Sequence, residues 1–259
     1  MHVDLLLETF GATWRELRAG AVAAEQAGLD GVWVNDHLAG AVQDASRVLE
    51  CWTVLSALAA EVPRIAIGPL VLNVANQDPG TLAVMAATLQ HQSAGRLLIG
   101  VGAGARSGTS YAIEQEALGR RLPGAAERRQ RVEDTIATLR RVWSGTVPPA
   151  SGFLRPEPVP PVMVAATGPK MAELAGRVGD GICVPVGSTM AELVAVARAA
   201  QAGWDRDQRR LLVTALLSSW PERTGPPVGA DVDRLILYVA PPFEKDISRL
   251  SDIVGRWRI

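Results

Sequence analysis

Short apolar segments alternate with longer amphipathic segments along most of the chain. The short segments, such as 31–34, are apolar throughout, which is typical of parallel strands covered on both faces. The longer segments, such as 14–27, repeat apolar residues at the three- and four-residue spacing of a helix. The pattern predicts eight strands, at 3–7, 31–34, 65–71, 96–100, 162–165, 181–184, 211–217 and 234–239.

Most of the predicted strands are followed by a predicted helix. The helix at 79–92 has the clearest start signal, because Asp78 can cap it and Pro79 suits its first position. The connection at 219–231 is rich in Pro and Gly, so we expect the seventh helix to be trimmed. The predicted helices are 14–27, 52–60, 79–92, 125–143, 169–177, 190–203 and 247–257.

This repeat of strand and helix predicts an α/β fold, a single (β/α)8 TIM barrel in one domain covering residues 1–259. The alternative is an open doubly wound sheet, because Gly100-x-Gly102-x-Gly104 resembles part of a dinucleotide-binding fingerprint. The next small position of that fingerprint is displaced, and the segment follows the fourth predicted strand rather than the first. The pattern therefore favours the barrel.

Charge and composition narrow the classes of function. The chain has 26 Lys and Arg and 27 Asp and Glu, interspersed, for a net charge of −1, so no basic surface is predicted for nucleic acid or an anionic membrane. No apolar run approaches the ~18 residues of a membrane-spanning helix, and the N-terminus lacks the features of a signal peptide. The two cysteines lie far apart in the sequence, so neither a disulfide framework nor a cysteine-based zinc site is expected. We therefore expect a cytoplasmic protein with a small-molecule substrate.

In a barrel, function is expected at the carboxyl ends of the strands. Asp36-His37 follows the second predicted strand, and a histidine beside a carboxylate that orients its ring is suited to proton transfer. The alternative is a polar turn. We predict that His37 is catalytic and that Asp36 orients it. Metal sites are not expected, because no set of His or carboxylate residues has ligand spacing.

Three other strand ends are candidate cofactor contacts. Thr167-Gly168-Pro169-Lys170 could bind a phosphate, because the backbone can approach closely at Gly168 and Pro169 begins a helix whose free N–H groups attract anions. Lys170 is one of only two lysines in the chain, and an ordinary helix start is the alternative. Gly187-Ser188 could contact the same phosphate. Gly102-Ala103-Gly104 could let a flat ring lie against the backbone, or it could be a purely structural turn.

Several of these segments, in this order and spacing, resemble the luciferase-like monooxygenase superfamily, which includes bacterial luciferase and the deazaflavin-dependent F420 oxidoreductases. The matching segments are 24–37, 87–96, 100–104, 166–181 and 232–235. The resemblance implies a (β/α)8 barrel that binds FMN or F420 at the carboxyl end of its strands. It also implies a bulge after the third strand with a non-proline cis peptide, here near Leu70-Val71, and these two residues are expected to contact the cofactor. A homodimer or larger homo-oligomer is implied as well.

The resemblance also bears on the cofactor. In the F420 branch, Asp-His follows strand two and Gly-Pro-Lys follows strand five, as Asp36-His37 and Gly168-Pro169-Lys170 do here. Bacterial luciferase has a phosphate-binding arginine where this chain has Ala103, so F420 is favoured over FMN. Sugar-phosphate dehydrogenases of the family carry a glutamate where this chain has Ala105, which argues against glucose 6-phosphate as the substrate.

The resemblance therefore implies an F420-dependent oxidoreductase that transfers a hydride between the deazaflavin and an unidentified small organic substrate at the barrel mouth. Two alternatives remain open. One is an FMN-dependent monooxygenase that uses reduced flavin and O2. The other is a catalytically silent protein that binds flavin or F420.

Overall fold

The computed structural model describes residues 1–146, 152–204, 210–218, 228–229, 231–243, 246–247 and 250. Within them, all strands belong to one parallel sheet, whose neighbours follow the order β3-β2-β1-β9-β8-β7-β6-β5-β4. The strands are β1 (His2–Leu7), β2 (Gly31–Val34), β3 (Ala66–Pro69), β4 (Leu72–Asn73), β5 (Ile99–Gly102), β6 (Val162–Ala165), β7 (Gly181–Pro185), β8 (Leu212–Leu217) and β9 (Arg234–Val239).

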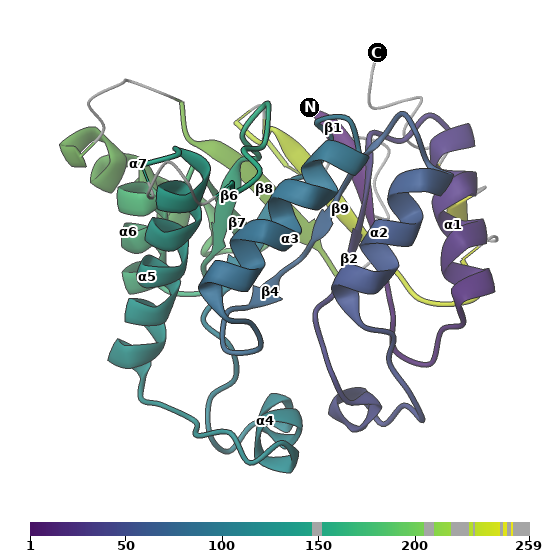
Figure 1. Ribbon diagram of the computed structural model, residues 1–259, viewed down its shortest axis with the longest axis horizontal. Helices are drawn as coiled ribbons and strands as arrows, with labels where there is room; N and C mark the ends of the chain where they lie inside the picture. Colours follow the sequence, from purple (N-terminus) through teal and green to yellow (C-terminus); the bar gives the residue numbers. More distant parts are fainter. Residues whose placement is uncertain are drawn as a thin grey trace.

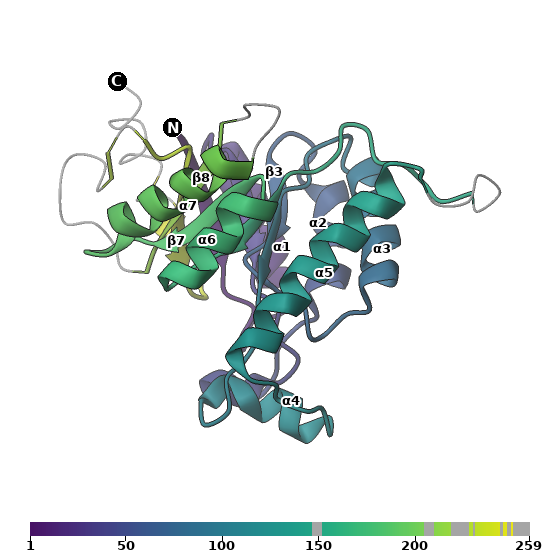
Figure 2. The ribbon, with the colours of Figure 1, turned by 90° about the vertical axis from the view of Figure 1, so that its left-hand side faces the viewer.

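The helices lie outside the sheet and run back along it (Figure 1). They are α1 (Trp14–Gln26), α2 (Cys51–Glu61), α3 (Pro79–Gln92), α4 (Ile113–Ala117), α5 (Ala125–Trp143), α6 (Pro169–Val178) and α7 (Met190–Trp204), with 3-10 helices η1 (Gly40–Gln43) and η2 (Ser110–Ala112). In both ribbon views α4 projects below the sheet, at the end where the strands finish (Figures 1 and 2). Within the described residues, no helix combines the length and the apolar content needed to cross a bilayer.

The predicted third strand is two short strands, β3 and β4, because the chain bulges at Leu70 and Val71 between them. β3 pairs with β2, whereas β4 pairs with β5. The free edge of β3 also meets the segment before β5, since the Ile67 amide donates to Arg96 O at 3.1 Å and the Leu98 amide donates to Ile67 O at 2.9 Å. These bonds close the sheet, so the predicted barrel is confirmed and the open sheet is excluded.

Two apolar cores follow from the alternation of side chains along each strand. In β1, Leu5 and Leu7 face the helices, and Leu6 faces the barrel interior. The interior cluster fills the barrel as a packed core, as in TIM barrels generally. Its buried members are Leu6, Trp33, Leu70, Met163, Cys183 and Ile236.

Most of the sequence predictions agree with the structure. The bounds of β2, β6, β9, α3 and α5 are those predicted. The short elements η1, η2 and α4 were not predicted. The trimmed connection at 219–231 and the closing helix at 247–257 lie largely outside the described residues.

Candidate active site

A cleft of about 800 Å³ opens at the carboxyl ends of strands β2 to β6. Asp36 and His37, which follow β2, line it together with Leu70 and Val71 of the bulge. Gly102, Ala103, Gly104 and Thr167, from the ends of β5 and β6, also line it. The structure thus brings together the predicted catalytic pair and much of the predicted cofactor surface.

The bulge contains a cis peptide bond between Leu70 and Val71, where the family resemblance implied one. Val71 packs against the glycines of β5. A Cβ on Gly100 would lie 2.8 Å from Val71 Cγ1, and one on Gly102 would lie 2.7 Å from Val71 Cγ2. Gly104 has a φ of +73° and faces the Asn73 side chain. Close packing of the bulge therefore accounts for these glycines, although Gly102 and Gly104 still line the cleft.

Asp36 connects the end of β2 to the bulge. It is 2% exposed, and its Oδ2 accepts a hydrogen bond from the Asn73 amide at 2.9 Å. Within the described part of the chain, Oδ1 is buried and has no hydrogen-bond partner. Burial raises the pKa of Asp36 to about 6, although the Asn73 amide partly offsets this. Asp36 is therefore a half-satisfied buried carboxyl group in the cleft.

His37 contacts a different carboxylate from the one predicted. Its Nδ1 lies 3.3 Å from Oε2 of Glu114, which belongs to α4 and also accepts the Leu38 amide at 2.8 Å. Asp36 was expected to orient His37, but its bonded oxygen is directed to Asn73. Both residues lie beyond the end of β2, and each contacts a different partner.

The electrostatics of the pair favour an ionised Glu114. Its side chain is 1% exposed, and burial alone would raise its pKa. The hydrogen bonds from His37 and the Leu38 amide outweigh burial, so the pKa of Glu114 is lowered. Phe10 and Tyr111 flank the imidazole, with ring centroids 4.9 Å and 5.6 Å away. His37 is thus held from several sides.

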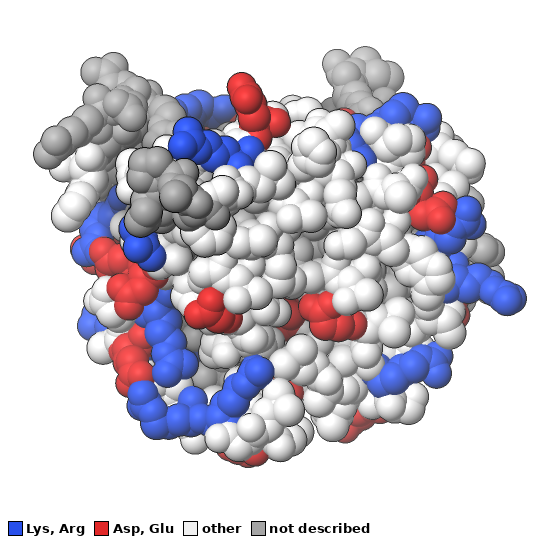
Figure 3. Space-filling view, in the orientation of Figure 1, with Lys and Arg blue, Asp and Glu red and all other residues white. Residues whose placement is uncertain are grey.

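Arginines that the sequence interpretation overlooked line another part of the cleft. Arg128 donates from Nη1 to Gly104 O at 2.8 Å, and its buried Nε has no partner within the described residues. Arg106 and Arg129 also line the cleft. Figure 3 shows basic side chains gathered over the N-terminal end of α5 and the segment that joins it to α4. This positive charge suits the anionic part of a ligand.

The predicted phosphate loop is only partly at the cleft. α6 begins at Pro169 with Gly168 as its N-cap, as predicted, and Thr167 lines the cleft. Lys170 instead lines a separate cavity of about 410 Å³ between α5 and α6, which it shares with Arg129. Gly187-Ser188, between β7 and α7, are not among the residues that line the cleft. Their predicted contacts with a cofactor stay predictions.

Comparison with known proteins identifies the family. A family model described as luciferase-like monooxygenase matches residues 2–222. The chain belongs to this family. The resemblance seen in the sequence is thereby confirmed.

Curated relatives of this luciferase-like chain carry F420-dependent names. The F420-dependent glucose-6-phosphate dehydrogenase of Microbacterium testaceum is 34% identical over 185 residues, which are 67% of this chain and 53% of that protein. The F420-dependent hydroxymycolic acid dehydrogenase of Mycobacterium tuberculosis is 31% identical over 176 residues, 64% of this chain and 47% of that protein. The chain therefore spans about half the length of the curated relatives it matches.

Solved structures share the luciferase-like fold at low identity. An F420-dependent secondary alcohol dehydrogenase, solved with an F420-acetone adduct, has a TM-score of 0.82 at 17% identity, covering 100% of this chain and 99% of that one. The EDTA monooxygenase from Chelativorans sp. BNC1 has a TM-score of 0.65 at 18% identity, covering 86% and 66%. At these identities the similarity supports the barrel fold alone.

The cleft of this luciferase-like chain fits a flavin or deazaflavin. Its volume of about 800 Å³ and its apolar bulge suit a flat ring system. Arg128, whose buried Nε has no partner among the residues that the structure describes, and the neighbouring arginines suit the phosphate of such a cofactor. Leu70, Val71 and Gly102 would contact the ring.

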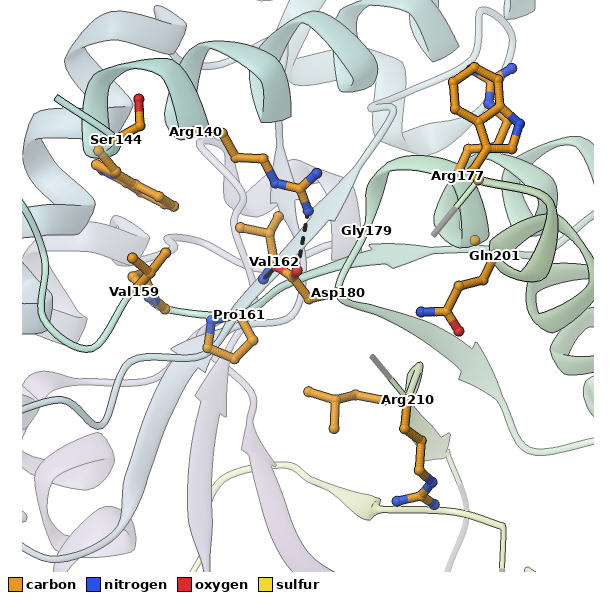
Figure 4. A pocket seen from close by; sticks show the side chains of 15 residues that line it. Arg140, Ser144, Val159, Pro161, Val162, Arg177, Gly179, Asp180, Gln201 and Arg210 are labelled. Atoms are coloured by element: carbon orange, nitrogen blue, oxygen red, sulfur yellow. Dashed lines mark hydrogen bonds and ion pairs between the residues drawn. The ribbon is translucent and has the colours of Figure 1, made fainter. Parts of the chain in front are cut away.

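A second cleft of about 760 Å³ lies at the opposite end of the barrel (Figure 4). Its three arginines are already engaged by carboxylates. Arg140 pairs with Asp180 at 3.2 Å, as the dashed line in Figure 4 shows. The remaining pairs are Arg177 with Glu133, at 2.9 Å, and Arg210 with Asp233, at 2.6 Å. Because this end of a barrel usually serves stability, we place the candidate site at the mouth.

Proposed function

We propose that the chain is an F420-dependent oxidoreductase that transfers a hydride between the deazaflavin and a small organic substrate at the barrel mouth. The observation that carries the proposal is that His37 and the Leu70-Val71 bulge line the same cleft. The F420-dependent names of its curated relatives support the choice of cofactor.

His37 is the proposed proton carrier. A bound deazaflavin supplies a ring carbon that accepts or returns a hydride. His37 lines the cleft, and Glu114 contacts its Nδ1, so Nε2 is the nitrogen available to exchange a proton with substrate. In the oxidation of an alcohol, His37 would take the O–H proton, and a bound deazaflavin would supply the acceptor for the C–H hydride. The reverse reaction returns both to the carbonyl product.

The proposed cofactor site has an apolar part and an anionic part. Leu70, Val71, Gly102, Ala103 and Gly104 would hold the ring. Thr167 and the arginines of the cleft would hold the phosphate, with the predicted contacts from the Gly168-Pro169-Lys170 and Gly187-Ser188 segments still to be tested. The side chains named for the ring are apolar or absent, so they position the cofactor without reacting with it.

The second candidate is an FMN-dependent monooxygenase. The fold is shared with EDTA monooxygenase, and Arg106 lies three residues after the position of the luciferase arginine. This function would require reduced flavin and O2. A catalytically silent binding protein is less well supported, because His37 is held by a buried carboxylate that such a protein would not need.

Cofactor titration distinguishes these functions. The purified protein is titrated with F420 and with FMN, and fluorescence is followed. We expect saturable binding of F420 at lower concentration than FMN, and reduction of F420 with a member of a panel of secondary alcohols and glucose 6-phosphate. Tight FMN binding with negligible F420 binding would overturn the proposal, and F420 binding without turnover would favour the silent protein.

The His37→Ala variant tests the proposed proton carrier. We expect turnover to fall by about 10²–10⁴-fold, the usual contribution of acid–base catalysis, with cofactor affinity largely unchanged. Unchanged turnover would contradict this role.

A further inference from the structure

We infer that Glu114 is a positioning residue for His37: its carboxylate accepts a hydrogen bond from Nδ1–H and leaves Nε2 unprotonated. The inference rests on contacts within the chain. Its importance for catalysis also rests on the proposed function. Glu114 is not part of the predicted Asp36-His37 motif, because it lies 77 positions from His37 in the sequence.

The tautomer follows from the partners of the two ring nitrogens. An ionised carboxylate is only an acceptor, so the nitrogen of His37 that lies 3.3 Å from Glu114 Oε2 must be the donor. Burial opposes ionisation of Glu114, but the two hydrogen bonds that it accepts lower its pKa. Within the described residues, no hydrogen bond reaches Nε2 of His37. That nitrogen therefore keeps its lone pair in the neutral ring.

α4 is fixed in place by contacts that do not involve the imidazole. Gln115 donates from Nε2 to Asn76 Oδ1 at 2.6 Å, and Arg120 donates from Nη1 to the same oxygen at 2.9 Å. The Leu38 amide donates to Glu114 Oε2 at 2.8 Å. The carboxylate is thus held between the segment after β2 and the loop after β4. These contacts hold Glu114 in place independently of the imidazole.

A fixed carboxylate also supports the charged form of the imidazole during turnover. When Nε2 takes a proton from a bound hydroxyl, His37 becomes positively charged, and Glu114 is the anion that already contacts it. The side chain of Glu114 is 1% exposed, so water screens this attraction little. Asp36 contributes differently, because its bonded oxygen holds the Asn73 amide.

The closing experiment reads the tautomer of His37 without cofactor or substrate. The chain has three histidines, His2, His37 and His91, so ¹⁵N-histidine NMR is simple to assign with a His37→Ala spectrum. At neutral pH we expect His37 in the wild-type protein to carry its proton on Nδ1. A wild-type spectrum with the proton on Nε2 would overturn the inference, whatever the variants do.

Two variants test the role of the carboxylate. In Glu114→Leu the acceptor oxygens are lost, and we expect the Nε2–H form to become the major neutral tautomer of His37. Glu114→Asp tests whether a retained charge keeps the Nδ1–H form. Glu116→Gln is the matched control, because Glu116 is exposed on the same helix, and it should leave the spectrum unchanged. A folded Glu114→Leu protein with the wild-type tautomer would overturn the inference.

The kinetic arm separates this inference from the proposed function. With F420 and a working substrate, Glu114→Gln should lower kcat by about 10–100-fold while the Kd for F420 changes by less than about twofold. If the tautomer result holds but no protein turns over F420, the proposed function fails and the positioning of His37 stands. Equal kcat in Glu114→Gln and wild type would show that the positioning does not serve catalysis.

Discussion

Two carboxyl groups are buried at opposite ends of the barrel, and their surroundings differ. Asp4, near the start of β1, is 0% exposed, and its two oxygens accept Arg234 Nη1 at 2.8 and 2.7 Å. Trp33 Nε1 donates to it at 2.8 Å. Asp36, beyond the end of β2, accepts one amide and leaves Oδ1 without a partner among the described residues.

The difference indicates which end of the barrel is built for stability. Burial raises the pKa of both groups, but at Asp4 the Arg234 charge and two sets of hydrogen bonds act against burial. A fully satisfied buried network fixes the packing around it, whereas a buried oxygen without a partner destabilises the fold. Asp36 lines the cleft at the mouth, where a ligand can bind. Incomplete satisfaction there is consistent with a binding site.

The largest expected effect is on stability at the end of the barrel opposite the mouth. Asp4→Ala leaves Arg234, 17% exposed, without its buried partner, which should lower the free energy of unfolding by about 3–5 kcal/mol. Urea denaturation measures this. Glu61→Ala, which removes the partly exposed partner of the exposed Arg18, is the control and should leave the midpoint nearly unchanged. A small loss in Asp4→Ala would mean that the two ends do not differ as proposed.

The second effect is a pH dependence of the free energy of unfolding, caused by Asp36 at the mouth. The pKa of Asp36 is raised from 3.8 to about 6, so the folded protein binds this proton more tightly than the unfolded chain. Its contribution to stability is fully present below pH 3.8 and is lost as the pH rises through 6, by about 3 kcal/mol. Asp36→Asn keeps an acceptor for Asn73 but does not titrate.

Urea denaturation of both proteins at pH 4 and pH 7 isolates this effect. The free energy of unfolding of wild type, relative to that of Asp36→Asn, should fall by about 2 kcal/mol between pH 4 and pH 7. An equal difference between the two proteins at both pH values would show that Asp36 does not titrate in this range.

The sequence predicts the regular part of the fold because the signals there are local. β6 is apolar throughout, and α3 begins at the capping residue Asp78. α4 carries no such signal. It has five residues, and its Ile113 is 41% exposed, so the apolar spacing that marks an amphipathic helix is missing. The split of the third strand likewise depends on contacts with β5, which the apolar pattern of 65–71 does not encode.

The candidate site was predicted in part for the same reason. Asp36-His37 was found because the two residues are adjacent and follow a strand. Their partners were not, because Asn73 and Glu114 lie 37 and 77 positions away from them and become neighbours only when the barrel closes. A carboxylate in the segment between β5 and α5 was the only available clue to Glu114.

The third effect concerns the packing of the bulge. In Gly102→Ala the added Cβ would lie 2.7 Å from Val71 Cγ2, so the bulge must shift, and we expect a stability loss of about 1–3 kcal/mol. Cofactor affinity should fall with it, because Val71 lines the cleft. Gly203→Ala, in α7, is the control, since nothing lies within 4 Å of its Cβ position. Equal stability of both variants would show that the bulge adapts freely.

The smallest effect distinguishes two candidate phosphate sites at the mouth. Arg129 lines both the cleft and the groove between α5 and α6, whereas Lys170 lines only the groove among the cavities described. We expect Arg129→Ala to weaken cofactor binding by about tenfold, equivalent to about 1.4 kcal/mol, and Lys170→Ala to weaken it less. Fluorescence titration of both variants at two salt concentrations measures this, because a lost phosphate contact also reduces the salt dependence. The opposite order would place the phosphate at the start of α6, where the sequence predicted it.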